Sequence, residues 1–247
     1  MIDLVVAVIA AFLLGSIPFA LLVGFTRGVD IRTVGSKNPG ATNLGRTLGF
    51  RYFLIAFILD ALKGAAPTLA WGFYADLIPI TPAELTSGKS LGWLAVVIAP
   101  VLGHMFSPWI GFKGGKGVAT GLGALLGVWP FLTIPGLGAF VVFIATLAVW
   151  RYVGLSSSLA AGSLPLWTWY FFGLLSYQAA ERGATELDTP TRPEIVSWPF
   201  LGITGLLAVF VIAKHRGNLE RILRGSEPRL GGARSDDEIK ATPSENR

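Results

Sequence analysis

The sequence predicts an all-α, polytopic membrane protein with seven transmembrane helices, its N-terminus outside and its C-terminus in the cytoplasm. Of its 247 residues, 52% are hydrophobic and only 14% are charged, whereas soluble domains carry roughly 25% charged residues. Several apolar runs reach the length of about 20 residues that a helix needs to cross a bilayer. Basic residues gather in alternate loops between these runs, which indicates an orientation.

Five apolar runs are each long enough for one span: residues 4–25, 52–74, 91–110, 155–177 and 198–213. The stretch 118–150 is longer than a single span requires. It is interrupted at Trp129-Pro130 and at Pro135-Gly136. It can therefore form either one kinked helix or a hairpin of two short helices.

The distribution of charge decides between these two possibilities. The loops after the first and third spans are basic through Arg27, Arg32, Lys37, Arg46, Arg51, Lys113 and Lys116. Arg151 and the segment 214–224 are basic too, while the intervening loops mix Lys89, Arg182 and Arg192 with Asp76, Glu84, Glu181, Glu186, Asp188 and Glu194. The positive-inside rule places the basic loops in the cytoplasm. The stretch 118–150 must then cross an even number of times, which favours a hairpin whose turn, between Trp129 and Gly136, lies outside.

Composition also bounds the domain organisation and the chemistry. Residues 1–225 are predicted to form a single integral membrane domain, and the polar residues 226–247 a disordered cytoplasmic tail. The chain has no Cys and only two His, so thiolate chemistry is excluded and neither a metal nor a cofactor is expected. The net charge of +5 is attributed to orientation and to anionic headgroups, not to nucleic acid.

The segment "GSKNPGATNLGR", residues 35–46, is a candidate phosphate-binding loop. Its glycines allow a close approach of the backbone to a ligand, and such turns form anion-binding concavities. Arg46 can bind a phosphate through two parallel hydrogen bonds. The alternative is an Asn-Pro turn that caps a helix. The residues proposed to bind phosphate here are Gly35, Ser36, Asn38, Thr42, Asn43 and Arg46.

The segment "GFKGGKGVAT", residues 111–120, combines glycines and lysines at the start of an apolar helix, which favours anion binding. It is not a Walker A loop, because Ile110 and Gly117 stand where Gly and Ser/Thr are required. A flexible basic turn is the alternative. The predicted phosphate-binding residues are Lys113, Gly114, Gly115 and Lys116.

The segment "KHRGNLERILRG", residues 214–225, follows the last span directly. His215 and Asn218 are three residues apart and share one helix face. A basic juxtamembrane helix that only fixes topology is the alternative, and it is favoured for Arg221 and Arg224.

Three further polar residues occur inside the spans. Asp60 and Lys63 are expected to face the bundle interior and to pair, because unpaired charges are expensive in lipid. A structural role is favoured for them. His104 is interpreted as a buried histidine whose hydrogen bonds are satisfied.

Together, "GSKNPGATNLGR", "GHMFSPWIGFKGGKGVAT" and "HRGNLERILRGSE" resemble the bacterial membrane-integral glycerol-3-phosphate acyltransferases of the PlsY family. The resemblance covers most of the chain before the tail. It implies transfer of the acyl group of an acyl phosphate to the 1-hydroxyl of glycerol 3-phosphate, giving lysophosphatidic acid for phospholipid synthesis. It further implies a bacterial plasma membrane enzyme whose site faces the cytoplasm, coupled to a soluble enzyme that forms acyl phosphate.

The resemblance also implies roles for individual residues. Ser36 and Arg46, with Gly114, Gly115 and Lys116, correspond to residues that gather the phosphates. His215 and Asn218 correspond to a pair that orients or polarises the reacting groups. The predicted catalytic set is therefore Ser36, Arg46, Lys116, His215 and Asn218. The hydroxyl proton goes either to His215 or to a phosphate oxygen of the donor, and the resemblance favours the donor.

The chain departs from the family pattern at two positions. Gly154 replaces a usual Ser, whose contact could pass to Ser156, Ser157 or a backbone N–H, and Lys37 stands where a small residue is common.

Two rival functions are less favoured. A transporter of phosphorylated metabolites would require a repeat and polar groups at mid-membrane, and a phosphatidyltransferase would require an Asp-rich metal motif.

Overall fold

The computed structural model describes residues 1–78, 80–185 and 197–230, and every regular element in these ranges is helical. The α-helices are α1 (Ile2–Ser16), α2 (Phe19–Phe25), α3 (Ala41–Leu48), α4 (Phe50–Tyr74), α5 (Ser87–Met105), α6 (Val118–Leu126), α7 (Thr133–Trp150), α8 (Val153–Thr185) and α9 (Trp198–Leu223). Two 3₁₀ turns, η1 (Pro82–Glu84) and η2 (Pro108–Ile110), flank α5.

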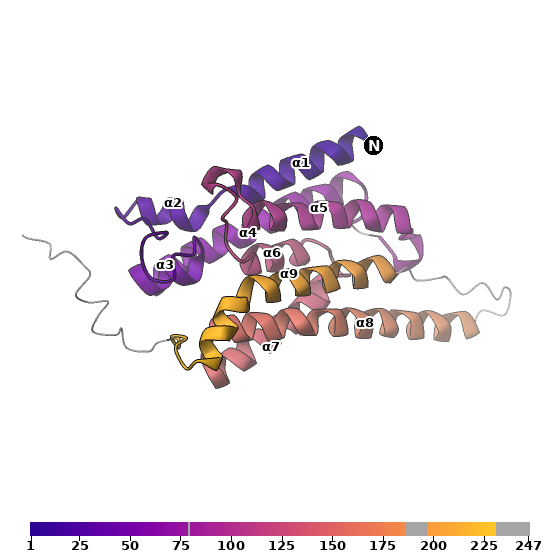
Figure 1. Ribbon diagram of the computed structural model, residues 1–247. Coiled ribbons are helices and arrows are strands. Elements are labelled where there is room, and N and C mark those ends of the chain that lie inside the picture. The colour runs from indigo at the N-terminus through magenta and orange to yellow at the C-terminus, as the bar shows by residue number, and fades with distance from the viewer. Residues whose placement is uncertain (79, 186–196, 231–247) are drawn as a thin grey trace, which may run out of the picture.

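The long helices lie side by side along one direction, with the short α6 among them (Figure 1). Helix α1 packs on α5, α6 on α4, and α8 on both α7 and α9. Helices α2 and α3 and the C-terminal end of α9 lie at one end of this bundle, and the N-terminus lies at the other (Figure 1). The first and third sequence motifs therefore share one end of the molecule.

Five helical segments in the described ranges are long and apolar enough to cross a membrane: Ile2–Phe25, Phe50–Tyr74, Ser87–Ile110, Thr133–Trp150 and Trp198–Leu223. The predicted class, a helical multi-pass membrane protein, is thereby confirmed. The count of seven crossings and the orientation of the termini stay predictions.

The stretch 118–150 forms two helices, α6 and α7, and not a single kinked one. The chain leaves the helix between Gly127 and Leu132, so α7 already begins within the turn predicted at 129–136. Thr133 Oγ1 donates to the carbonyl of Leu126 at 3.0 Å and ties the start of α7 to the end of α6. A tight connection therefore joins the short helix α6 to the longer helix α7.

Several elements differ from their predicted bounds, and α8 continues to Thr185 instead of ending near residue 177. The first span is interrupted at Ile17 and Pro18, where Ile17 is extended, because a proline disfavours helical geometry in the residue before it. Residues Ala41–Leu48, expected as part of a loop, form α3. The last span continues as one helix to Leu223, so the third motif lies on the same rigid element as that span.

Small residues allow α6 to approach α4 closely. A Cβ atom on Gly64 would lie 2.1 Å from the carbonyl oxygen of Thr120, and one on Gly123 would lie 1.9 Å from that of Ala61. Contacts of this kind are typical of helices that associate in membranes. They fix the helix that follows the second motif against a long span.

Asp60 and Lys63 face the interior of the bundle and pair, as predicted. Each is only 2% exposed, and Lys63 Nζ lies 2.8 Å from Asp60 Oδ1. The pair is therefore removed from lipid.

Residues 226–230 lie against the helices instead of extending away from them. The amide of Leu230 donates to the carbonyl of Arg151 at 2.7 Å, and Arg151 Nε donates back to the carbonyl of Leu230 at 3.0 Å. We call residues 226–230 the strap. The predicted tail thus differs from the structure in its first five residues. Its remainder, 231–247, lies outside the described residues, as do the loop charges Glu186, Asp188, Arg192 and Glu194.

Candidate functional site

Asn43 organises the first motif from inside. Its side chain is buried at 2% exposure. Its Nδ2 donates to the carbonyls of Ile31 at 2.7 Å and Val34 at 3.2 Å, and its Oδ1 accepts from the amide of Ser36 at 2.9 Å. Both amide hydrogens are thus used within the loop. Asn43 therefore shapes the loop, and the phosphate contact predicted for it stays a prediction.

Gly35 is required by the same packing. Its φ of +55° lies in the left-handed region, which glycine adopts at little cost. A Cβ atom there would lie 2.6 Å from Asn43 Oδ1. Gly35 therefore permits the loop to close over Asn43.

Arg46, on α3, reaches across the bundle to the strap. Its Nη2 donates to the carbonyl of Pro228 at 3.2 Å and lies 3.6 Å from Glu227 Oε1. The Arg46 side chain is 26% exposed, so its guanidinium lies near the surface. This arrangement brings the first motif to the residues that follow the third.

The second motif is held against the end of α5 by its own backbone. The amide of Gly114 donates to the carbonyl of Met105 and that of Gly115 to the carbonyl of His104, each at 3.2 Å. These two N–H groups were predicted to bind phosphate, but they already have partners. Gly114 and Gly115 instead allow the loop to lie close to α5, which directs the next residue, Lys116.

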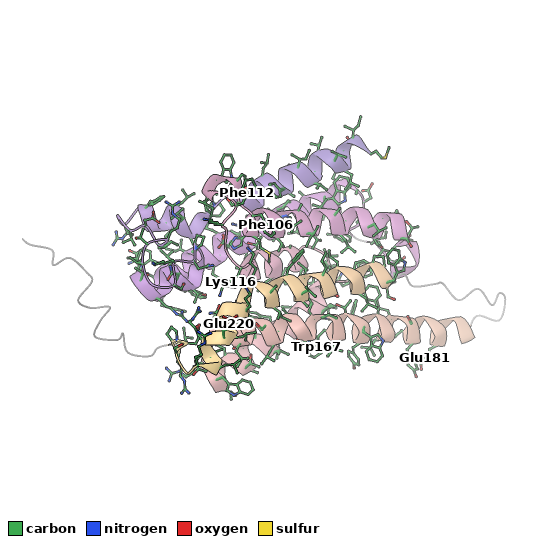
Figure 2. All side chains as sticks on the ribbon, in the orientation of Figure 1. Phe106, Phe112, Lys116, Trp167, Glu181 and Glu220 are labelled. Carbon is green, nitrogen blue, oxygen red and sulfur yellow. The ribbon has the colours of Figure 1, made fainter. Side chains whose placement is uncertain are left out.

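Lys116 lies at the centre of the site. Its Nζ donates to Asn218 Oδ1 of α9, and Figure 2 shows it at the same end of the bundle as Glu220 of that helix. Burial lowers the pKa of Lys116 to about 8. The Glu227 carboxylate opposes that shift, while Arg221 and Arg46 add to it. A positive charge is thus held where a bound phosphate would stabilise it.

His215 and Asn218 share the buried face of α9, as predicted, with 3% and 8% exposure. His215 Nδ1 lies 2.8 Å from the carbonyl of Val211. A carbonyl only accepts, so Nδ1 carries the hydrogen and Nε2 of the neutral ring is left as an acceptor. The ring can therefore receive a hydrogen bond from a hydroxyl.

Glu227 was not predicted as a site residue, yet it joins the cluster. Its side chain is fully buried. Oε1 accepts from Asn218 Nδ2 and Oε2 from Arg221 Nε, each at 2.7 Å. The signal available in the sequence was its position at the end of the third motif, "HRGNLERILRGSE". It was overlooked because polar residues after a span usually remain in water.

Gly154, which departs from the family pattern, lies against Asn218. A Cβ atom there would lie 2.6 Å from Asn218 Cβ, so the Asn218 side chain occupies the space of a serine side chain. Ser156 and Ser157, the predicted substitutes, donate instead to the carbonyls of Tyr152 and Val153, four residues earlier in the chain.

Within the described ranges, four predicted residues are not connected to the cluster by hydrogen bonds. Ser36 and Lys113 are exposed, while Asn38 and Thr42 are half-buried. In the part of the chain that the structure describes, no hydrogen bond connects them to Lys116, Asn218 or Glu227.

An apolar cavity of about 90 Å³ opens directly beside this polar cluster. Helices α6, α7, α8 and α9 line it, with Phe57 of α4 at one side. Gly117 follows Lys116 in the chain, and Val211 precedes His215 by one turn, so both belong to the wall nearest the polar cluster. The site therefore joins a cationic end to an apolar cavity. No group of acidic, His or Cys side chains suited to a metal ion occurs among the described residues.

Comparison with known proteins shows which family this chain is similar to. The sequence profile of a family described as glycerol-3-phosphate acyltransferase matches residues 5–225. The chain is 39% identical to a glycerol-3-phosphate acyltransferase of Thermosynechococcus vestitus, over 90% of this chain and 93% of that one. It is also 39% identical to one of Geobacter sulfurreducens, over 89% and 94%.

Two solved structures are similar to the chain as well. One is PlsY (YgiH), an integral membrane glycerol 3-phosphate acyltransferase, in its glycerol 3-phosphate form. It aligns with a TM-score of 0.71 and 32% identity over 97% of this chain and 100% of that one. The lysophosphatidic acid form aligns with a TM-score of 0.69 and 33% identity, over 92% and 95%.

Proposed function

The chain belongs to the glycerol-3-phosphate acyltransferase family, and from this premise we propose how it acts. It is an acyltransferase that acylates glycerol 3-phosphate and gives lysophosphatidic acid. We propose that the donor is an acyl phosphate, that the 1-hydroxyl is the acceptor, and that phosphate is the second product.

The observation that supports this proposal is the cationic cluster beside the apolar cavity. Arg46, Lys116 and Arg221 supply positive charge at its mouth. The cavity wall is formed almost entirely by apolar side chains and glycines. An acyl phosphate has the same two parts, a hydrocarbon chain and an anionic head. We place its chain in the cavity and its phosphate against Lys116 and Arg46.

The proposed reaction is a direct transfer. The 1-hydroxyl oxygen forms a bond to the acyl carbon, the bond from that carbon to the phosphate oxygen breaks, and phosphate leaves with the electron pair. Arg46 and Lys116 neutralise the two phosphate-bearing reactants and hold them in reach of each other. Asn218, with Lys116 on its oxygen and Glu227 on its nitrogen, keeps that geometry.

We propose that the hydroxyl proton passes to an oxygen of the departing phosphate. His215 Nε2 then orients the hydroxyl as a hydrogen-bond acceptor. His215 acting as general base is the alternative. Neither route requires a covalent intermediate on the protein, which has no Cys.

The proposal includes seven crossings of a bacterial plasma membrane, with the site on the cytoplasmic side. The asymmetry of Arg and Lys between alternate loops supports it. A site at that surface can receive acyl phosphate from a soluble enzyme that forms it.

The test is a reconstituted assay with acyl phosphate and labelled glycerol 3-phosphate in sealed vesicles without a gradient. We expect lysophosphatidic acid and phosphate in equal amounts, and no loss of activity on adding a chelator. Arg46→Ala should weaken the apparent affinity for a phosphate-bearing substrate by about ten- to hundred-fold, the equivalent of a hydrogen bond to a charged group. Arg46→Lys should restore only part, because the bidentate contact is lost.

Arg51→Ala is the matched control. Arg51 lies near the same end of the molecule, but its guanidinium contacts the ring of Tyr52. Full activity with acyl-coenzyme A alone would contradict the proposed donor. Transport of glycerol 3-phosphate without acylation would contradict the proposed function.

A further inference from the structure

Asp60, Lys63 and His104 form a group of buried polar side chains that do not reach the reacting groups. Asp60 and Lys63 are each 2% exposed and His104 is 8% exposed. Lys63 Nζ lies 2.8 Å and His104 Nδ1 3.7 Å from the same oxygen, Asp60 Oδ1. A buried ion pair can often be replaced by apolar residues without loss of stability, so its contacts must show what it does.

On one side the group holds the broken first span. Lys63 Nζ donates to the carbonyl of Ile17 at 2.6 Å. That carbonyl lies between α1 and α2, where Pro18 offers no N–H to the helix ladder. Lys63 thereby connects α4 to the break.

On the other side the group supports the second motif. A Cβ atom on Gly115 would lie 2.3 Å from His104 Nε2, so the imidazole ring lies directly against this loop glycine. The carbonyl of His104 accepts from the Gly115 amide. The carbonyl of Met105 accepts from both the Gly114 amide and Lys214 Nζ, each at 3.2 Å.

The contacts of Gly114 and Gly115 also restrict Lys116, because it is the next residue in the chain. Lys116 follows Gly115, and its Nζ contacts Asn218 Oδ1. A loop rich in glycine has many accessible conformations. Contacts that fix Gly114 and Gly115 therefore limit where the ammonium of Lys116 can lie.

We propose that Asp60, Lys63 and His104 are positioning residues for acyl transfer, and that they act through Lys116. The Asp60–Lys63 pair lies beside the His104 ring, with Asp60 Oδ1 3.7 Å from His104 Nδ1, and bounds the space that the ring occupies. The ring and the end of α5 fix the Gly114–Gly115 backbone. That backbone holds Lys116 on Asn218, ready for a phosphate. The inference rests on the proposed phosphate-binding role of Lys116.

The test compares His104→Ala in two backgrounds, the natural chain and Lys116→Ala. If His104 acts through Lys116, we expect His104→Ala to lower kcat/KM by about tenfold in the natural chain, mainly through KM for glycerol 3-phosphate. In the Lys116→Ala background the same change should cost less than about twofold, because residues that act as a unit are not additive. An equal loss in both backgrounds, or no loss in the natural chain, overturns the proposal.

Trp93→Phe is the control for a merely structural effect. Trp93 Nε1 donates to the carbonyl of Thr68 at 3.1 Å, so it joins the same two helices, α5 and α4, at a distance from the loop. It should lower Tm and change kcat/KM equally and little in both backgrounds. A Trp93→Phe effect that depends on Lys116 would overturn the proposal, because the coupling would not be specific to His104.

Gly115→Ala disturbs the contact between Gly115 and the His104 ring from the loop side. It replaces His104→Ala in the test if that variant does not fold. It should show the same dependence on Lys116, whereas Gly88→Ala, which has open space around it, should leave activity unchanged.

The rate at which an amine-reactive reagent modifies Lys116 in the substrate-free protein provides a readout without turnover. It should rise several-fold in His104→Ala. A natural chain that makes no lysophosphatidic acid refutes the proposed function, whereas unchanged Lys116 modification refutes this inference.

Discussion

Glu227 lies among Arg46, Arg221 and Lys116, the cations proposed to meet the substrate phosphates. Its carboxylate is fully buried and accepts hydrogen bonds from Asn218 and Arg221. Like charges held this close would repel each other without a counter-charge. Glu227 therefore allows several cations to be concentrated at one point before substrate binds.

The charge on Lys116 should make substrate binding pH-dependent. Because burial lowers its pKa to about 8, the ammonium loses its proton as pH rises through that value. We expect the affinity for glycerol 3-phosphate, measured by calorimetry without donor, to fall above pH 8. Lys116→Arg keeps its charge and should bind with little change between pH 8 and roughly pH 9.5. Identical pH profiles for the two proteins would show that another group titrates.

A side chain at position 154 should disturb Asn218. The Cβ atom of Gly154→Ser would lie 2.6 Å from Asn218 Cβ, so Asn218 must move and lose its geometry with Lys116. We expect kcat/KM to fall by about tenfold. Gly162→Ser, on the same helix with its nearest neighbour 3.9 Å away, is the matched control. Activity equal to that of the natural chain in Gly154→Ser would mean that Asn218 can rotate without cost.

His215→Gln separates an orienting role from a general base. A glutamine can hold a hydroxyl by a hydrogen bond but cannot titrate, so we expect turnover to stay within about tenfold. Loss of a general base typically costs 10²–10⁴-fold in turnover. A variant that binds both substrates normally yet turns over about a thousand-fold more slowly would assign the proton to His215.

The sequence indicated which motifs lie together better than it indicated what each residue contacts. The contact of Lys116 with Asn218 follows from two motifs predicted to lie together. The amides of Gly114 and Gly115, and the side chain of Asn43, were predicted to face phosphate but are used internally. Residue type limits what a group can bind, whereas the direction of a hydrogen bond depends on neighbours distant in the sequence.

At the scale of the element, the length of the apolar runs predicted the long helices but did not predict the short helix α3. Helix α4 begins and ends within two residues of its predicted span. Helix α3 was missed because Gly, Pro and Asn surround it, and these residues are typical of turns. The structure shows that α3 packs against its neighbours through two buried residues, Asn43 and Leu44.

The glycine contacts between α4 and α6 should be essential for stability. Gly123→Ala would place a Cβ atom 1.9 Å from the carbonyl oxygen of Ala61, so the helices must separate. Overpacking of this kind typically costs about 1–3 kcal/mol, and Tm in detergent should fall. Gly121→Ala, on the same helix with nothing within 4 Å, should keep or raise Tm because alanine favours helix. Equal Tm values for the two variants would show that α6 packs loosely.

At the scale of the whole molecule, the loop charges predict the orientation. Reporter fusions after Gly49, Gly117 and Arg224 should all report the cytoplasm, because they follow basic segments. A fusion after Asp76 should report the opposite side. A periplasmic signal at any of the first three positions would separate the motifs and contradict a single site.

The strongest prediction from the sequence about the whole molecule was that residues 118–150 cross the membrane an even number of times. It required 118–150 to turn back, and the chain there does form two helices, α6 and α7. Charge and span counting could not predict that residues 226–230 fold back onto the end of the bundle. That path depends on backbone hydrogen bonds between Leu230 and Arg151, which no local pattern encodes.

The path of the strap has a consequence for the gene. A nonsense mutation at codon 226 would remove only the last 22 of 247 residues. Here it would delete Glu227 and leave Arg221 and Arg46 without their buried counter-charge, so we expect a null allele. A stop codon after position 230 keeps every strap contact and should be phenotypically silent. The boundary between the two alleles lies within five codons.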